Sequence, residues 1–359
     1  MLYRSELRKT IPQRTVLLFF LLLCAFLCFL VFENQTAVPG FDQPVYEWYM
    51  NRLKGELTAE KEQYLRDEQA LIADTLSKEE SMRQDFLSEK ITREEYSDYC
   101  LALNYAKTHA EPLQLVLERY EYIRRFEAGN QDIRPVLLND IYWNRLLNCN
   151  PSSTNLFLLF FLAAMVTPVI YSEKKSGVFP VLYAAANGRG KTVWVKILTC
   201  VTISAAASLI FSAAEYALFS FVYALPLPCA PVQSLPSFSG IPGAVSLGGY
   251  YLILSLWRVL CCSFFCFLFL AISSFVRNLV TGLVLEICLL GVPLLFVPSA
   301  EHAAVFLPTA LINGNPLFSS YYLRGGVPSW AAAAVLMSAA CLLCARLIFL
   351  GYHSAHRKR

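Results

Sequence analysis

The chain contains 359 residues, of which 56% are apolar and only 16% are charged, and its mean hydropathy is +0.45. A soluble domain carries about 25% charged residues. The charges are unevenly distributed, since 22 of the 27 acidic residues but only 14 of the 30 basic residues lie between Glu33 and Arg145. That stretch has a net charge of −8, whereas the rest of the chain has +11. This composition excludes an ordinary cytosolic enzyme and predicts an integral membrane protein with one acidic, water-soluble block.

Six apolar runs are long enough to cross a bilayer as helices, which requires about 20 residues each. They cover Thr15–Phe32 and, approximately, residues 153–171, 193–225, 249–276, 279–297 and 330–350. The runs do not alternate as the strands of a membrane barrel would. The predicted fold class is therefore all-α, a polytopic membrane protein with six transmembrane helices and a helical extracytoplasmic domain between the first two.

The first run, Thr15–Phe32, has an alternative interpretation as a cleaved signal peptide. It is longer than the roughly 7–15 apolar residues of a signal-peptide core. The sequence after it, Glu33-Asn34-Gln35-Thr36, offers no pattern of small residues for cleavage. These two features favour an uncleaved membrane anchor.

The orientation follows from the lysine and arginine residues of the short loops, which favour the cytoplasmic side. Basic residues fill segments 1–14, 172–196 and 351–359, whereas the short loops on the opposite side, about 226–248 and 298–329, contain only Arg324. We therefore expect a multi-pass protein of the cell membrane with both termini in the cytoplasm. Residues 33–152 form the extracytoplasmic domain, and residues 153–350 contain the second to sixth transmembrane helices.

The extracytoplasmic domain is expected to consist of helical hairpins. Two capping boxes predict helix starts at Thr92 and at Ser77. Apolar residues recur at helical spacing in two sets: Tyr96, Tyr99, Cys100 and Leu103, then Leu113, Val116, Leu117 and Tyr120. Before the second set, Pro112 is predicted to lie in the first turn of a helix, and after it Gly129-Asn130 is predicted to end that helix. A seven-residue repeat of Leu57, Tyr64 and Leu71, with Leu65 and Ile72 beside it, predicts partly coiled-coil packing.

Residue chemistry typical of enzymes is missing from the sequence. Nine of the twelve cysteines lie in apolar spans, where a thiol behaves as a small hydrophobic group, and Cys341-x-x-Cys344 is among them. A disulfide between Cys100 and Cys149 in the outer domain is left undecided, because sequence spacing does not establish the geometry that a disulfide needs. There is no complete phosphate-binding loop, the four histidines do not form a His-x-x-x-His metal site, and there is no serine nucleophile motif. We therefore expect no enzyme activity, no metal and no cofactor in this chain.

Three ionisable residues lie inside the apolar runs, where a charge is costly unless it is paired or faces a polar cavity. Glu215 and Arg258 lie at equal depth below the outer ends of the third and fourth runs, which makes them a candidate ion pair. The alternative is that Arg258 extends separately to the outer headgroups. Glu286, near the middle of the fifth run, has no obvious partner in the sequence, and either a protonated carboxyl or a position on a transport pathway would accommodate it.

The segment between the second and third runs carries the most specific pattern. Glu173 ends one run, Gly177 follows four residues later, and an apolar stretch leads to the turn Gly188-Arg189, after which Lys196 opens the next run. Taken alone, this is a basic amphipathic loop at the cytoplasmic surface. In its order and placement, however, the segment 172–196 resembles the coupling region of the ABC transporter type-2 permease family, although Asn187 stands where that family often has proline.

This resemblance implies a permease subunit of an ATP-binding cassette exporter. It implies that Glu173, Gly177, Gly188, Arg189 and Lys196 couple the membrane helices to a separate cytoplasmic ATPase, which would hold the ATP and magnesium. It further implies a second permease half, identical or different, within the lipid bilayer, and no nucleic-acid partner. The substrate is not indicated. The alternative function is a membrane-anchored sensor or assembly factor whose outer helical domain binds a ligand or partner protein.

Overall fold

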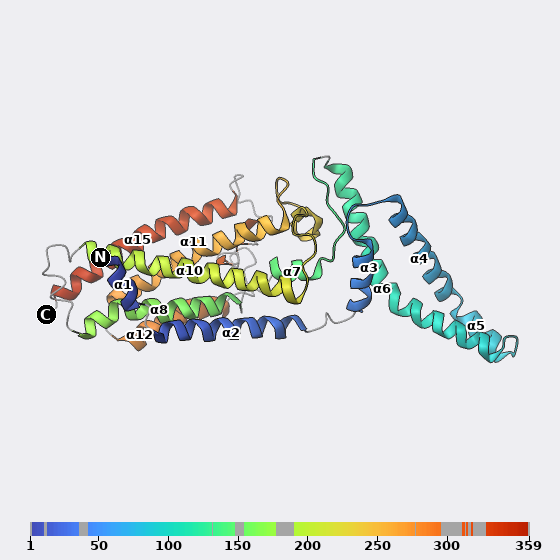
Figure 1. The fold of residues 1–359 in the computed structure, drawn as a ribbon, viewed down its shortest axis with the longest axis horizontal. Coiled ribbons are helices and arrows are strands. Elements are labelled where there is room, and N and C mark those ends of the chain that lie inside the picture. The colour runs from blue at the N-terminus through green and yellow to red at the C-terminus, as the bar shows by residue number, and fades with distance from the viewer. Residues whose placement is uncertain are drawn as a thin grey trace. The chain divides into compact units, whose positions relative to one another are not determined.

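The computed structural model of the chain describes residues 2–10, 13–35, 42–130, 132–147, 154–176, 190–276, 278–295, 311–312, 314, 317–318 and 328–357. Within these ranges the protein is all-helical and contains no strand. The chain divides into two compact units (Figure 1). Unit 1 comprises Met1–Glu33, Arg145–Ala224 and Tyr250–Arg359, and unit 2 comprises Asn34–Asn144 and Leu225–Gly249.

The described residues of unit 1 contain four helices long and apolar enough to cross a membrane. They are α8 (Thr154–Ser176), α10 (Lys191–Val222), α11 (Leu247–Phe275) and α15 (Ser329–Arg357). Two further helices, α2 (Gln13–Gln35) and α12 (Leu279–Leu295), have shorter apolar stretches at Val16–Phe32 and Leu279–Leu290. Four apolar helices of this length define an all-helical membrane protein, in agreement with the composition.

The helices of unit 1 pack through large apolar side chains. The ring of Phe19 on α2 lies 4.9 Å from that of Phe161 on α8, and Phe26 lies 5.1 Å from Phe211 on α10. A short helix α1 (Leu2–Thr10) packs on α10, and α8 lies against both α10 and α12 (Figure 1). Helix α2 is therefore an integrated part of the bundle, although its apolar stretch is short.

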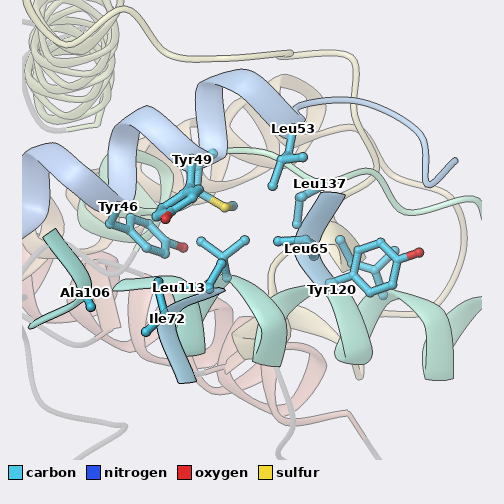
Figure 2. Close-up of a cluster of buried hydrophobic side chains, with 12 residues drawn as sticks. Tyr46, Tyr49, Leu53, Leu65, Ile72, Ala106, Leu113, Tyr120 and Leu137 are labelled. Atoms are coloured by element: carbon cyan, nitrogen blue, oxygen red, sulfur yellow. The ribbon is translucent and has the colours of Figure 1, made fainter. Parts of the chain in front are cut away.

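Unit 2 is built around the long helix α6 (Arg93–Gly129), on which α3 (Gln43–Leu53), α4 (Ala59–Ser77) and α5 (Glu79–Leu87) pack. The short helix α7 (Ile141–Leu147) begins at the end of this unit. Figure 2 shows the core, in which side chains of α3, α4 and α6 interlock with Leu137. Three tyrosines, Tyr46, Tyr49 and Tyr120, are among the buried residues of this core. Their hydroxyl groups reach polar partners while their rings are buried, which is how tyrosine is usually accommodated in a core.

The starts and stops of α6 test the predicted helix signals. The capping box at Thr92 is confirmed, because the Thr92 hydroxyl accepts from the Glu95 amide and the Glu95 carboxylate accepts from the Thr92 amide. The stop is also confirmed, since α6 ends at Gly129. The first-turn assignment of Pro112 is wrong, because α6 is one continuous helix of 37 residues with Pro112 buried in its interior. A proline there removes one backbone hydrogen bond, and burial against α3 and α4 holds the helix together despite that loss.

Two other expectations for unit 2 need correction. The capping box at Ser77 is wrong, because Ser77 is the last residue of α4 and its hydroxyl donates back to the Asp74 carbonyl. In the seven-residue repeat, Leu65 and Ile72 are buried, whereas Leu71 is 55% exposed. Leu57 and Tyr64 pack against this core as the repeat predicts, so Leu71 is the one member of the pattern that departs from it.

The segment Leu225–Gly249 belongs to unit 2, although sequence reasoning treated most of it only as a loop. It contains two short 3₁₀ turns, η1 (Val232–Ser234) and η2 (Pro236–Phe238). The Tyr122 hydroxyl donates to the Gln233 carbonyl over 2.8 Å, and the Val136 amide donates to the Ser234 hydroxyl over 3.0 Å. The indole of Trp143 donates to the Pro226 carbonyl over 2.7 Å. These bonds tie two segments separated by about a hundred residues into one folded body.

Candidate functional site

Two of the residues predicted for coupling meet in unit 1. Glu173 lies in the last turn of α8, and Lys196 lies in the second turn of α10. The Lys196 ammonium donates to the Glu173 carboxylate over 2.6 Å, and both residues are buried. A carboxylate is disfavoured at the C-terminal end of its own helix, where the backbone carbonyls are negative. The position of Glu173 is therefore stabilised by Lys196 on the neighbouring helix and not by α8 itself.

A third residue, Glu6 of α1, joins this pair. The Lys196 ammonium lies 3.1 Å from the Glu6 carboxylate, and only 7% of the Glu6 side chain is exposed. Lys196 thus connects two carboxylates that lie 190 and 23 residues away from it. Sequence reasoning missed Glu6. The available signal was that Glu6 is the only acidic residue within the basic segment 1–14.

The group of Glu6, Glu173 and Lys196, which we call the triad, fixes three helices of unit 1 to one another. Its ions are hydrogen-bonded to one another and lie away from water, where removing one partner strands the others at a cost of about 3–5 kcal/mol. Such a cluster holds the ends of α1, α8 and α10 as one rigid element. A force applied to the segment between α8 and α10 would therefore be transmitted to both helices and to α1.

Lys174, next to Glu173, has a separate structural role. Its ammonium donates to the carbonyl oxygens of Ser273, Ser274 and Val276 over distances of 3.0, 2.7 and 3.1 Å. These carbonyls lie at the C-terminal end of α11, where they have no partner within the helix and carry the negative end of its dipole. Lys174 thus caps α11 from α8, whereas the sequence indicated only a loop lysine facing the cytoplasm.

The middle of the predicted coupling segment cannot be compared with the structure. Gly177, Gly188 and Arg189 lie outside the described residues. The structure therefore places the two ends of the segment, Glu173 and Lys196, next to one another and gives no geometry for what lies between them.

The predicted ion pair between Glu215 and Arg258 is confirmed. The Arg258 guanidinium lies 2.8 Å from the Glu215 carboxylate, and the Glu215 side chain is fully buried. The same carboxylate oxygen accepts a hydrogen bond from the Tyr251 hydroxyl over 2.9 Å, and the guanidinium also donates to the Ser212 hydroxyl. The alternative, an arginine extending separately to the headgroups, is therefore wrong. The pair joins α10 to α11 within the apolar part of unit 1.

Glu286 of α12 is completely buried and contacts hydroxyl groups from two other helices. The hydroxyl of Thr167 on α8 lies 2.5 Å from one carboxyl oxygen, and that of Ser273 on α11 lies 3.5 Å from the other. The sequence offered no obvious partner for Glu286, and these hydroxyls are partners that a sequence pattern does not reveal.

Unit 2 contains a polar network on one side of its core. The Tyr49 hydroxyl donates to Glu68 over 3.0 Å and lies 2.9 Å from Nδ1 of His109, while Tyr105 donates to the same carboxylate and stacks on the His109 ring. Burial raises the pKa of Tyr105 to about 12, with the hydrogen bond to Glu68 adding to the effect. Burial lowers the pKa of His109 below 6.5, because it disfavours the charged ring, while Glu68 and Asp42 partly oppose this effect.

No group of three or more metal-ligating side chains occurs among the described residues. The eleven cysteines in these ranges are free, including Cys100, Cys341 and Cys344, and Cys149 lies outside the described residues. Comparison with known proteins finds no matching family model, no matching curated protein and no matching solved structure. The fold and the buried ion pairs thus define the chain only as an all-helical membrane protein with charged groups held inside its helix bundle.

Proposed function

We propose that this chain is the membrane-spanning permease subunit of an ATP-binding cassette exporter, driven by a separate cytoplasmic ATPase. The observation that carries the proposal is the triad, in which Glu173 and Lys196 bind one another at the two ends of the segment that resembles the type-2 permease coupling region. A lever between two membrane helices works only if its ends are rigid. Buried, hydrogen-bonded charges at both ends meet that requirement.

The proposal includes six transmembrane helices, with α2 and α12 added to the four long apolar helices. It also places both termini in the cytoplasm and unit 2 outside the membrane. The hydrogen bonds that tie residues 226–248 to the domain after α2 support this topology, because two segments of one folded body must lie on the same side. The lysine and arginine distribution favours the side opposite the basic loops for both segments.

Labelling of single cysteines tests this topology. In a cysteine-free variant, a cysteine at Ala59 or Ser237 should react with an impermeant thiol reagent in intact cells, since both positions are exposed. Cysteines at Ser5, Ser176 or Ser354 should be protected until the membrane is opened. Labelling at Ser176 in sealed cells would contradict both the orientation and the coupling proposal.

Reconstitution with an ATPase subunit that co-purifies from the native host tests the function. ATP hydrolysis and substrate efflux are measured together in proteoliposomes. We expect Glu173→Gln and Arg189→Lys each to reduce efflux per ATP hydrolysed, because the amide cannot bind Lys196 as an ion and lysine cannot make the two parallel bonds of a guanidinium. The matched control is Lys175→Gln on the same turn as Glu173, because Lys175 is exposed and should keep full coupling.

Two results would overturn the proposal. Full coupling in both Glu173→Gln and Arg189→Lys would leave only a likeness of sequence. Failure to recover any ATPase, together with capture of a soluble ligand or a different membrane protein by unit 2, would favour the sensor or assembly factor.

A further inference from the structure

Glu286 forms a site that the coupling proposal does not use. It lies on α12, is completely buried, and meets the hydroxyl of Thr167 from α8 at 2.5 Å. Two oxygen atoms this close require a proton between them, since the distance lies at the short limit of O–H···O hydrogen bonds. The proton of this bond comes either from the Thr167 hydroxyl or from the Glu286 carboxyl group, and the other contacts of Thr167 decide between them.

The Thr167 hydroxyl has a second contact at a similar distance. Its oxygen lies 2.6 Å from the carbonyl oxygen of Ala163, one turn earlier on α8. Threonine within a helix commonly donates in this way to the carbonyl four residues before it. A backbone carbonyl has no proton to give, so the single hydroxyl proton of Thr167 is used in this bond. The contact between Thr167 and Glu286 then needs a proton from the carboxyl group.

We propose that Glu286 is a proton-binding site, whose carboxyl group carries a proton and donates it to the Thr167 hydroxyl oxygen. The other carboxyl oxygen accepts from the Ser273 hydroxyl at 3.5 Å, so both ends of the neutral carboxyl group have a partner. An ionised carboxylate without a cation would be costly in an apolar helix bundle, and binding a proton removes that cost.

The charged groups on the surrounding helices are occupied elsewhere. On α8, Glu173 is bound to Lys196, while Lys174 donates to three carbonyls of α11 and Lys175 is exposed. On α11, Arg258 is bound to Glu215 and lies 15 residues before Ser273, about 22 Å along the helix. The other titratable groups on these three helices are the phenols Tyr171, Tyr250 and Tyr251 and the thiols Cys261, Cys262, Cys266 and Cys288. Among the described residues, no cation forms an ion pair with Glu286.

Infrared spectroscopy of the purified chain in lipid nanodiscs tests the proposal, because the carbonyl stretch of a protonated carboxyl group is separate from the bands of a carboxylate. We expect such a band at neutral pH, a loss of it in Glu286→Gln, and no change in Glu121→Gln, a control with an exposed carboxylate. Glutamine has the shape of a protonated glutamate and can donate to Thr167, so this variant should fold with an unchanged melting temperature. On alkalinisation the band should disappear and carboxylate bands should replace it.

Variants of the acceptor provide a second test that does not depend on replacing Glu286. Thr167→Val removes the acceptor while keeping the shape of the side chain and should shift the band, whereas Thr167→Ser retains the hydroxyl and should leave it in place. A wild-type spectrum without this band at neutral pH, or a band that survives in Glu286→Gln, would overturn the proposal. Since neither measurement involves an ATPase or transport, the result is independent of the permease proposal.

Discussion

The two units of this protein differ in how they accommodate charge. In unit 2 most ion pairs lie at the surface, as in Arg125–Glu121, where both side chains are more than half exposed. In unit 1 the ion pairs are buried, and the Lys196 and Glu215 side chains are only 3% and 0% exposed. Water screens the surface pairs of unit 2, so each contributes little. In unit 1 the paired charges are removed from water, so losing one partner leaves a buried charge without its counter-ion.

The largest expected effect is therefore at the buried pair of unit 1. Arg258→Met or Glu215→Gln alone should lower the free energy of unfolding by about 3–5 kcal/mol, because each strands or unbalances the other group. The double exchange Glu215→Arg with Arg258→Glu should recover part of this loss. Thermal unfolding in detergent measures all of these variants.

The surface pair of unit 2 supplies the control for this experiment. Arg125→Met removes a cation that is 79% exposed from its pair with Glu121 and should cost less than about 1 kcal/mol. If Arg258→Met lowers the free energy of unfolding no more than Arg125→Met does, the buried pairs of unit 1 contribute no more than the surface pairs of unit 2. A double exchange that performs no better than either single change would show that Glu215 and Arg258 do not act as a pair.

A somewhat smaller effect is expected in the apolar core of unit 2. Leu113→Ala should cost about 2–5 kcal/mol, because Leu113 is 2% exposed and its removal leaves a cavity in the cluster of Figure 2. Leu101→Ala on the same helix is the control, since Leu101 is 70% exposed and the change should stay within about 0.5 kcal/mol. Hydrogen exchange of the α6 amides measures both variants, and equal protection would contradict the assigned core.

The smallest expected effect on stability concerns His109, a partly buried histidine whose pKa is lowered by burial. Its pKa in the folded protein lies below the unfolded value of 6.5, so the folded state favours the neutral ring. The resulting stabilisation is fully present above pH 6.5 and is lost as the pH falls through the lowered pKa. Acidification should therefore destabilise unit 2 of the wild-type protein more than that of His109→Gln.

Fluorescence of Trp48 measures this titration directly, because its ring lies 6.1 Å from that of His109. A protonated imidazole close to an indole quenches its emission, so emission should fall with a midpoint below pH 6.5. The transition should be absent in Trp48→Phe and in His109→Gln. A midpoint at or above 6.5 would mean that the carboxylates of Glu68 and Asp42 outweigh burial.

In unit 2 the sequence correctly predicted those helix ends that depend only on residues next to them in the chain. The capping box at Thr92 and the stop at Gly129 depend only on neighbouring backbone groups, and both are confirmed. The interpretation failed where distant residues decided the outcome. Pro112 remains inside α6 because α3 and α4 pack on that helix, and Leu71 is exposed although it continues the predicted repeat.

The membrane-protein class and the pairing of Glu215 with Arg258 also followed from the sequence alone. Apolar runs are costly to expose to water, and two opposite charges at equal depth in such runs have few alternatives to one another. Only the tertiary structure revealed that Glu6 joins Lys196 and that Thr167 meets Glu286. These contacts link residues 190 and 119 positions apart. Helix packing brings such residues together, and no spacing rule along the chain encodes which faces of two distant helices will meet.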